Sequence, residues 1–384
     1  MSTRRMITAL CPHLDGNSLV RSVPIIDSLR QLYDVQVLGF LGEDKEVFGP
    51  FRDRRDFQRV VVDKRRRLWP RFWGAIREMA QRVEGSLVYV FKPFPSTLLA
   101  GNLARRRLRC PLLVDVEDWD ACGYFENHGF SARYDQIRSI RWPYNDLWLR
   151  LGETLVKTAD AVTVVSSFLQ KRHGGEIVYH GPNTSLYDPA VFDTREVRQK
   201  LRLSQDVCYL LFAGEAWGHK GVTTVCQAVA ALGRQDVRVL LLGSETPMVK
   251  KCVAIAPGLV EYRGMRPYHE MPLWLAAADI VPVLQADTPY ARAQIPGKML
   301  DAAAMGKAIL ATPVGDVPVA LGDGAAFCGD GSVDSVAPVL RRLVEDRGWR
   351  QQLGSRARAR AVECFGHDAI RRRIVPIVER LVND

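Results

Sequence analysis

The amino-acid sequence predicts an α/β protein of two domains, each a parallel sheet doubly wound with helices, with the two domains facing a cleft. Three observations lead to this fold class. The chain has 384 residues, enough for two or three domains with separate cores. Short apolar strands alternate with segments of helical spacing along almost all of it. A turn-rich passage containing Gly and Pro interrupts the alternation at 176–192.

The alternation before this passage supplies the first domain. Strands are expected at 6–12, 35–41, 86–91, 111–116 and 161–166. Residues 20–32 carry apolar side chains at helical spacing, 96–107 are also predicted to be helical, and Ser167 can open a further short helix. Because helical segments follow these strands, the strands should run parallel, with both faces of the sheet covered.

The same pattern restarts after the interruption. Strands are expected at 209–214, 237–243, 260–264, 279–284 and 308–312, and helices at 222–232 and 298–305. The chain closes with an Arg-rich helical pair at 356–382, broken near 365–367. We therefore predict an N-terminal domain at 1–182, a C-terminal domain at 183–364, and a last helix at 365–384 that packs back toward the N-terminal domain.

Composition excludes several classes of protein. An apolar fraction of 47% argues against wholesale disorder. The 8 cysteines include no C-x-x-C pair, which argues against a zinc ribbon and favours reduced thiols in a cytoplasmic protein. No window approaches the roughly 20 apolar residues of a membrane-spanning helix, and the first apolar run is too short for a signal peptide.

Two segments of the second domain have the features of an anion site. In GEAWGHKGV (214–222), Gly214 lets the chain leave a strand and Lys220 precedes a helix, where free N–H groups and the helix dipole favour phosphate. The alternative is a solvated turn lysine. In QIPGKMLDAAAMGKAIL (294–310), Pro296 and Gly297 open a helix with Lys298 in its first turn, against the dipole.

Asp301 follows Lys298 by three positions, on the same face of the predicted helix. Its carboxylate could accept hydrogen bonds from the two hydroxyls of a ribose. The alternative is that Lys298 and Asp301 simply form an ion pair with each other.

The first domain offers two further candidates at strand ends. HLDGN (13–17) contains His13, which could hydrogen-bond an acceptor, and Gly16, where the chain could approach a phosphate closely. DVEDWD (115–120) places four carboxylates beyond a strand, where they repel one another. We expect Asp118 to touch a reacting sugar or an acceptor hydroxyl. The alternatives are a structural histidine and a solvated acidic loop or helix cap.

Taken together, these segments resemble the nucleotide-sugar glycosyltransferases of the GT-B type, which have two Rossmann-like domains, and within them glycosyltransferase family 4. The resemblance covers most of the chain. It is carried by ADAVTVVSSFL (159–169), YHGPNTSLYDP (179–189), the 209–229 segment, PGKMLDAAAMGKAILAT (296–312), and LVYVFKPFPST (87–97) with LLVDVEDWD (112–120).

The resemblance implies retaining transfer of a sugar from a nucleotide-diphosphate donor held mainly by the second domain. Lys220 would contact the diphosphate, Asp301 the ribose and Lys298 the phosphates or sugar, with the segment 260–267, which contains Gly264, close to the base. Two family positions differ here, since Ala293 replaces a glutamate and Glu215 an arginine.

Arg292 or Lys298 could supply the positive charge that Glu215 does not. No cofactor and no metal are expected, because no Asp-x-Asp pair follows a strand on the donor side. The predicted function is a glycosyltransferase acting on a sugar or lipid-linked acceptor in glycan, polysaccharide or glycolipid synthesis. A nucleotide-sugar epimerase of the same fold is one alternative. A basic nucleic-acid-binding protein is another, disfavoured because no nucleic-acid module is recognised.

The net charge of +10 lies mostly in the first half, where two stretches combine arginine with aromatic residues. They are 64–83, with Trp69, Phe72 and Trp73, and 138–155, with Arg138, Trp142 and Trp148. Arginine with tryptophan suits the boundary of an anionic membrane. We therefore predict peripheral attachment to the cytoplasmic leaflet. The alternative is that the aromatic side chains pack inward and the arginines face solvent.

Overall fold

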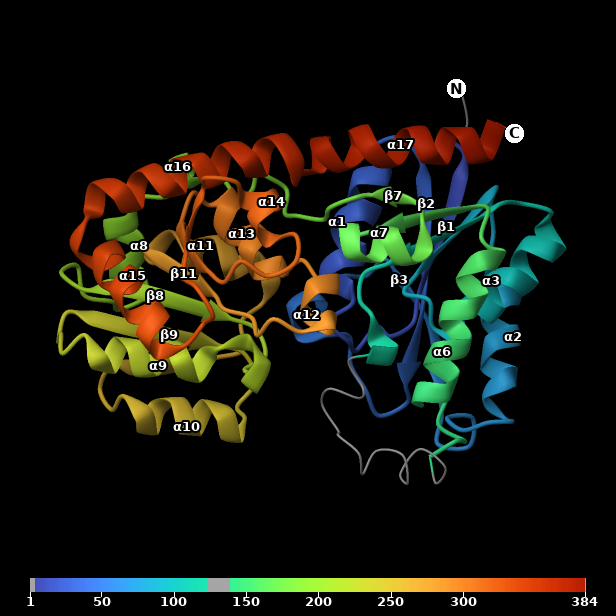
Figure 1. Ribbon diagram of the computed structural model, residues 1–384. Helices are drawn as coiled ribbons and strands as arrows, with labels where there is room; N and C mark the ends of the chain where they lie inside the picture. Colours follow the sequence, from blue (N-terminus) through green and yellow to red (C-terminus); the bar gives the residue numbers. More distant parts are fainter. Residues whose placement is uncertain (1–3, 123–138, 384) are drawn as a thin grey trace. The chain divides into compact units, whose positions relative to one another are not determined.

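The computed structural model describes residues 4–122 and 139–383, and these form two compact α/β units (Figure 1). The first unit comprises Met1–His180 together with Ile370–Asp384, and the second comprises Gly181–Ala369. The second unit thus begins at Gly181, close to the 182/183 boundary expected from the turn-rich passage. The C-terminal segment from Ile370 onward belongs to the first unit.

The first unit contains a parallel sheet with the strand order β3-β2-β1-β4-β5-β6-β7. Its strands are β1 (Met6–Cys11), β2 (Asp34–Gly42), β3 (Phe57–Val62), β4 (Leu87–Phe91), β5 (Leu112–Val116), β6 (Ala161–Val164) and β7 (Glu176–Ile177). The sequence analysis did not predict β3 or β7. β3 is an edge strand that carries exposed Gln58 and Arg59, so it lacks the apolar run by which the other strands are recognised.

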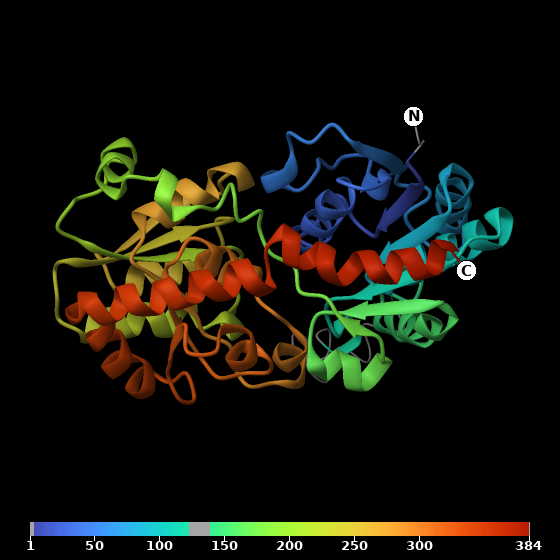
Figure 2. The same ribbon diagram turned by 90° about the horizontal axis from the view of Figure 1, so that it is seen from above.

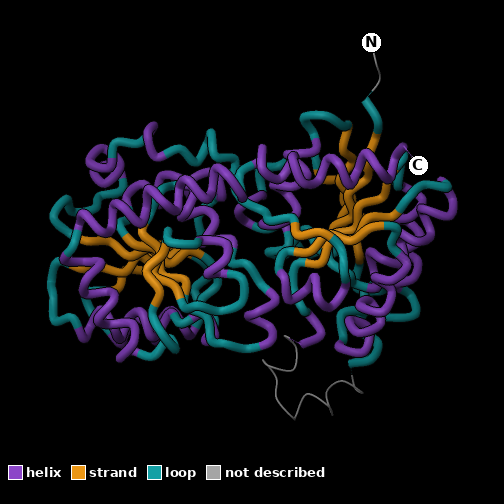
Figure 3. Tube along the Cα trace, turned by 45° about the horizontal axis from the view of Figure 1, so that its top comes forward, coloured by secondary structure: helices purple, strands orange, loops and turns teal. Residues whose placement is uncertain are grey.

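Helices flank this sheet, and Figure 3 shows its strands as a layer between them. In the described part of the first unit, the helices are α1 (Leu19–Leu29), α2 (Phe72–Arg82), α3 (Pro95–Leu108), α6 (Asp146–Leu155), α7 (Ser167–His173) and, from Ile370 on, most of α17 (His367–Asn383). Strand β4 is buried at every position, as expected of a strand covered on both faces.

The second unit repeats the design with the order β10-β9-β8-β11-β12-β13, again parallel. Its strands are β8 (Cys208–Ala213), β9 (Val237–Leu242), β10 (Val260–Gly264), β11 (Ile280–Val283), β12 (Ala308–Ala311) and β13 (Ala325–Phe327). Its helices are α8 (Thr194–Lys200), α9 (Val222–Ala231), α10 (Pro247–Ile255), α11 (Met271–Ala277), α12 (Pro289–Ala293), α13 (Gly297–Ala304), α14 (Val317–Leu321), α15 (Val333–Glu345) and α16 (Arg347–Cys364). α16 and α17 are the consecutive red helices of Figure 2.

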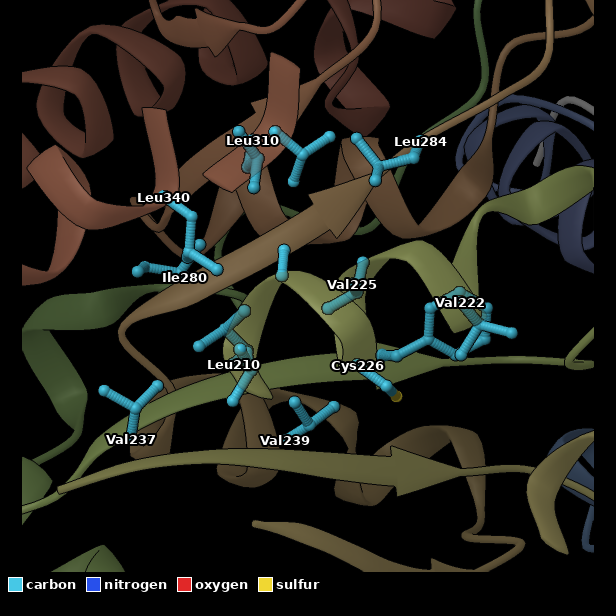
Figure 4. Packing of buried hydrophobic residues seen from close by; sticks show 14 of the residues in the cluster. Leu210, Val222, Val225, Cys226, Val237, Val239, Ile280, Leu284, Leu310 and Leu340 are labelled. Carbon is cyan, nitrogen blue, oxygen red and sulfur yellow. The ribbon is translucent and has the colours of Figure 1, made fainter. Parts of the chain in front are cut away.

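Side chains from one face of this sheet and from the helices that cover it form one apolar cluster (Figure 4). Val225 and Cys226 of α9 lie in it with Leu210 of β8 and Val239 of β9, all essentially inaccessible to solvent. Burying each large aliphatic side chain contributes about 1.5–3 kcal/mol. This core holds the carboxyl ends of the strands in fixed positions.

Each sheet has one topological switch point. This is the position between two neighbouring strands from which the chain continues toward one edge of the sheet on one side and toward the opposite edge on the other. It lies between β1 and β4 in the first unit and between β8 and β11 in the second. Ligands of doubly wound sheets bind beyond the carboxyl ends of the strands at such points. Functional side chains are therefore expected at these two edges.

Candidate functional site

The turn after β8 brings Lys220 to the start of α9. Gly214 leaves the strand with φ +115°, and a short 3-10 turn, η4 (Gly218–Lys220), ends at Gly221 with φ +62°. A Cβ at Gly221 would lie 2.5 Å from Cβ of Leu284, so only glycine fits here. The Lys220 backbone is therefore fixed immediately before the N–H groups that open α9.

Lys298 brings a second cation to the same edge. It lies in the first turn of α13, where its Nζ lies 3.5 Å from the centroid of the Phe212 ring of β8. Burial, and then the charge of Lys220, lower the pKa of Lys298 well below its ordinary value. Among the residues that the structure describes, none forms an ion pair with Lys298. Two neighbouring cations at a switch point make a site for an anion.

Asp301 does not neutralise Lys298, so the alternative of an internal ion pair on α13 is wrong. Its carboxylate accepts a hydrogen bond from the Tyr268 hydroxyl at 3.1 Å. Burial raises the pKa of Asp301 to about 7, despite this hydrogen bond, which lowers it. An oxygen of the carboxylate is left to accept hydrogen bonds from a ligand.

The other donor-side candidates differ in their surroundings. Pro296 and Gly297 open α13 as expected, and Gly264 ends β10 with φ +77° and open space around its Cα. Arg292, in contrast, is exposed and donates two hydrogen bonds to Asp287, at 2.6 and 2.7 Å. Its guanidinium is engaged by Asp287, so of the two residues predicted to supply the charge that Glu215 lacks, Lys298 remains the candidate.

Gln285 is a buried polar residue that the sequence analysis missed. It follows β11 and is 7% exposed, and its backbone N–H and C=O both bond the Thr312 hydroxyl, at 2.9 Å each. Its side-chain Oε1 is buried without a hydrogen-bond partner in the described part of the chain. A single glutamine after an apolar strand gives no sequence signal. Only the strand order shows that it lies at the switch point.

In the first unit, the strand-end carboxylates turn out to have structural partners. Asp115, fully buried, accepts hydrogen bonds from Arg21 Nε at 2.7 Å and Nη2 at 2.6 Å, and from the Thr163 hydroxyl at 2.6 Å. The repulsion expected among the four acids is therefore offset at Asp115. A buried, bidentate arginine offsets its charge.

Lys92, which follows β4, forms ion pairs with the three remaining acids, which follow β5. Its Nζ lies 3.2 Å from Glu117, 2.8 Å from Asp118 and 3.0 Å from Asp120. Burial raises the pKa of Glu117 to about 8 and also raises that of Asp120, because one ammonium offsets three carboxylates only in part. Asp118 thus forms an ion pair with Lys92, next to Glu117, whose carboxyl group keeps its proton at pH 7.

His13 lies beside this cluster. Its ring packs against Tyr144, with centroids 4.2 Å apart, and against Phe94 at 5.8 Å, and Lys92 lies 5.5 Å from the same Phe94 ring. Burial lowers the pKa of His13 to about 4, so the imidazole is neutral at pH 7. A Cβ at Gly16 would meet only Cβ of His13, at 3.4 Å, so packing does not require glycine there.

The structure therefore brings the candidates together in two groups, one at each switch point. The second unit carries Lys220, Lys298 and Asp301, and the first carries His13 and Asp118. Within the described residues, no group of three His, Cys, Asp or Glu side chains could hold a metal ion.

The family model that matches this chain covers part of the second unit. Residues 208–346 match the model of the family described as Glycosyl transferases group 1. The D-inositol 3-phosphate glycosyltransferase of Streptomyces avermitilis is 29% identical over an alignment of 227 residues, and the match covers 54% of this chain and 47% of that protein. The chain thus matches about half the length of this curated relative.

Solved structures match almost the whole chain. The sucrose-phosphate synthase of Thermosynechococcus elongatus has a TM-score of 0.73 at 16% identity, over 99% of this chain and 100% of that one. HepE of Anabaena, in complex with UDP and glucose, has a TM-score of 0.74 at 19% identity, over 98% and 100%. These likenesses confirm the predicted fold class, two Rossmann-like domains of the GT-B type.

Proposed function

The chain has the GT-B fold and matches the Glycosyl transferases group 1 family over 208–346, and from this premise we propose that it transfers a glycosyl group from a nucleotide-diphosphate sugar to an acceptor hydroxyl. We propose further that transfer retains the anomeric configuration and serves glycan, polysaccharide or glycolipid synthesis. Both finer statements rest on the resemblance to family 4.

One observation carries the proposal. Lys220 and Lys298 lie at the switch point of the second sheet, and Lys298 has no acidic partner among the described residues. Bringing two ammonium groups together in a partly buried site is unfavourable unless an anion joins them. A diphosphate, with its charge spread over several oxygens, is the ligand that this arrangement fits.

The same groups supply the chemistry of the donor half-reaction. When the glycosidic bond breaks, negative charge accumulates on the leaving diphosphate, and cations already in position stabilise it without reorganising. Asp301 would accept hydrogen bonds from the ribose. HepE of Anabaena, a structural neighbour, has been solved with UDP-glucose, which supports a nucleotide sugar as the donor here.

For the acceptor we propose the first unit. Asp118, in its ion pair with Lys92, could accept a hydrogen bond from the attacking hydroxyl, and neutral His13 could hold a second hydroxyl. The acceptor would be a sugar or a lipid-linked sugar. A cytoplasmic location is consistent with the cysteines, none of which forms a disulfide within the described chain.

The test is turnover with and without an acceptor. Purified protein is incubated with a panel of nucleotide sugars, and release of nucleoside diphosphate is measured in the presence and absence of candidate acceptors. The proposal expects acceptor-dependent release that Lys220→Ala abolishes and Lys251→Ala, an exposed lysine on α10, does not. Conversion of the donor sugar without an acceptor would instead identify an epimerase.

A further inference from the structure

We infer that the first unit docks on an anionic lipid bilayer through a surface assembled from two stretches far apart in sequence. This basic-aromatic surface consists of exposed apolar side chains and exposed arginines: Ile140, Trp142, Leu147 and Leu151, with Arg65, Arg67 and Arg71. Membrane attachment was predicted from the sequence of both stretches. Arg138, which was named in that prediction, lies outside the described residues. The union of the two stretches into one surface was not predicted.

Trp69 joins the two stretches. Its backbone N–H donates to the carbonyl of Arg141 at 2.8 Å, and Arg141 Nε donates back to the Trp69 carbonyl at 3.1 Å. The Trp69 ring packs on Trp148 of α6, with centroids 5.0 Å apart, and Trp148 in turn donates to the carbonyl of Ile140 at 2.6 Å. The segment that precedes α2 is thereby held next to the start of α6 (Figure 1).

The apolar part of the surface remains in water. Ile140 is 45% exposed, Trp142 44%, Leu147 48% and Leu151 38%. Leu147 and Leu151 are four residues apart and share one face of α6, while Leu149 on another face is buried. The alternative that the aromatic side chains pack inward holds for Phe72, which is buried, and in part for Trp69 and Trp148, which pack on each other and are half-buried, but not for exposed Trp142.

The three arginines of this surface have no acidic partner among the described residues, in contrast to two arginines nearby. Arg66 pairs with Glu78 at 2.8 Å and Arg150 with Asp146 at 2.8 Å. Arg65, Arg67 and Arg71 are exposed and form no ion pair with any residue that the structure describes.

The combination selects the partner. A nucleic acid would use the arginines but leave Leu147 and Leu151 in water, whereas a bilayer takes both, with guanidinium groups at the headgroups and indole and aliphatic groups at the acyl boundary. No helix in the described residues is long and apolar enough to cross a membrane. The attachment that we infer is therefore peripheral and reversible.

Cosedimentation with vesicles tests the inference. The full chain is mixed at low salt with vesicles of phosphatidylcholine alone or with 30 mol% phosphatidylglycerol. We expect binding only to the anionic vesicles, released at high salt as screening shortens the reach of each charge. Replacing Arg65, Arg67 and Arg71 together by Ser should weaken binding about 100-fold, at about fivefold per arginine.

A matched variant controls for net charge. Arg195, Lys200 and Lys251, exposed in the second unit, are replaced together by Ser, which removes the same charge elsewhere. This variant should bind vesicles nearly as wild type does. Replacing Trp142, Leu147 and Leu151 together by Ser should weaken binding without changing its salt dependence. Circular dichroism checks that each variant is folded.

Two results would overturn the inference. One is wild-type protein that stays in the supernatant with anionic vesicles at low salt, whether or not it binds single-stranded DNA through these arginines. The other is equal loss of vesicle binding in the two charge variants. Because vesicle binding needs no turnover, either result leaves the proposed glycosyl transfer to be judged by its own assay.

Discussion

Asp301 is an acid whose surroundings oppose its charge. Burial raises its pKa to about 7, so the folded protein keeps a proton that the unfolded chain releases near pH 4. The free energy of unfolding should therefore fall as pH rises from about 4 to about 7. Asp301→Asn should remove this dependence and should be more stable than wild type at pH 8. Urea unfolding at pH 4.5, 6 and 8 measures both effects.

The same substitution separates a ribose contact from a structural role. An ionised carboxylate accepts from both ribose hydroxyls, so wild-type affinity for a nucleoside diphosphate should rise as pH passes through about 7. Asp301→Asn should lose that rise and discriminate less against the 2′-deoxy ligand. An equal loss of affinity for ribose and deoxyribose ligands in calorimetry would argue against the contact.

Gln285 presents the opposite case, a neutral group without a partner. Its Oε1 is buried and unpaired in the described chain, a situation that costs about 1–3 kcal/mol in a folded protein. We expect a hydroxyl of the donor sugar to satisfy it. Gln285→Met should therefore leave the unliganded protein as stable or more stable, and should raise KM for the nucleotide sugar about tenfold or more.

Binding of the nucleoside diphosphate alone is the control for this prediction, because that ligand has no sugar. Its affinity should be unchanged in Gln285→Met. If KM for the nucleotide sugar also stays at the wild-type value, Gln285 does not contact the sugar.

At the scale of elements, α16 fixes the helix that carries the donor residues. Arg358 of α16 donates to the carbonyl of Ala304, at the end of α13, at 2.6 Å. It also donates to the carbonyls of Tyr187 at 2.6 Å and Thr184 at 2.9 Å, in the segment that opens the second unit. One half-buried guanidinium thus satisfies three backbone acceptors and places a positive charge at the carboxyl end of α13.

Arg358→Met should destabilise the protein by about 2–3 kcal/mol, since three carbonyls lose a charged donor. Arg356, on the same helix, provides the comparison, because it is 52% exposed and only pairs with exposed Asp323 at 3.2 Å. Arg356→Met should cost less than about 1 kcal/mol. Chemical denaturation of both variants measures the difference. Similar values for the two would mean that the carbonyl contacts contribute little.

For the whole molecule, the periodicity of apolar residues was enough to predict the fold class. Strands of a parallel sheet are buried on both faces, so they are apolar at nearly every position and are easily recognised. Periodicity missed β3, whose polar residues mark an edge strand, and β13, whose three residues are too few for a pattern. Lys298 could be proposed because a lysine in the first turn opposes the helix dipole, and Asp301 because it lies on the same face of that helix.

Contacts between side chains that lie on different strands and helices, far apart in the sequence, could not be predicted. Lys92 and Arg21 precede the acids of β5 by tens of residues, and nothing local links them to Asp115 or Asp118. The same holds for Trp69 and Arg141, which join two stretches predicted separately. The position of Gln285 likewise depends on strand order and not on a motif.

At the scale of the whole molecule, we propose above all that the second unit binds a nucleoside diphosphate through Lys220 and Lys298. Calorimetric titration of wild type and Lys298→Met with UDP and the other nucleoside diphosphates tests it most directly. At least one ligand should bind wild type, and Lys298→Met should weaken it by about 1.5–3 kcal/mol while raising the melting temperature of the unliganded protein, since a buried cation without an acidic partner is removed. Equal affinity in the two proteins, or no binding of any nucleoside diphosphate to wild type, would contradict the claim.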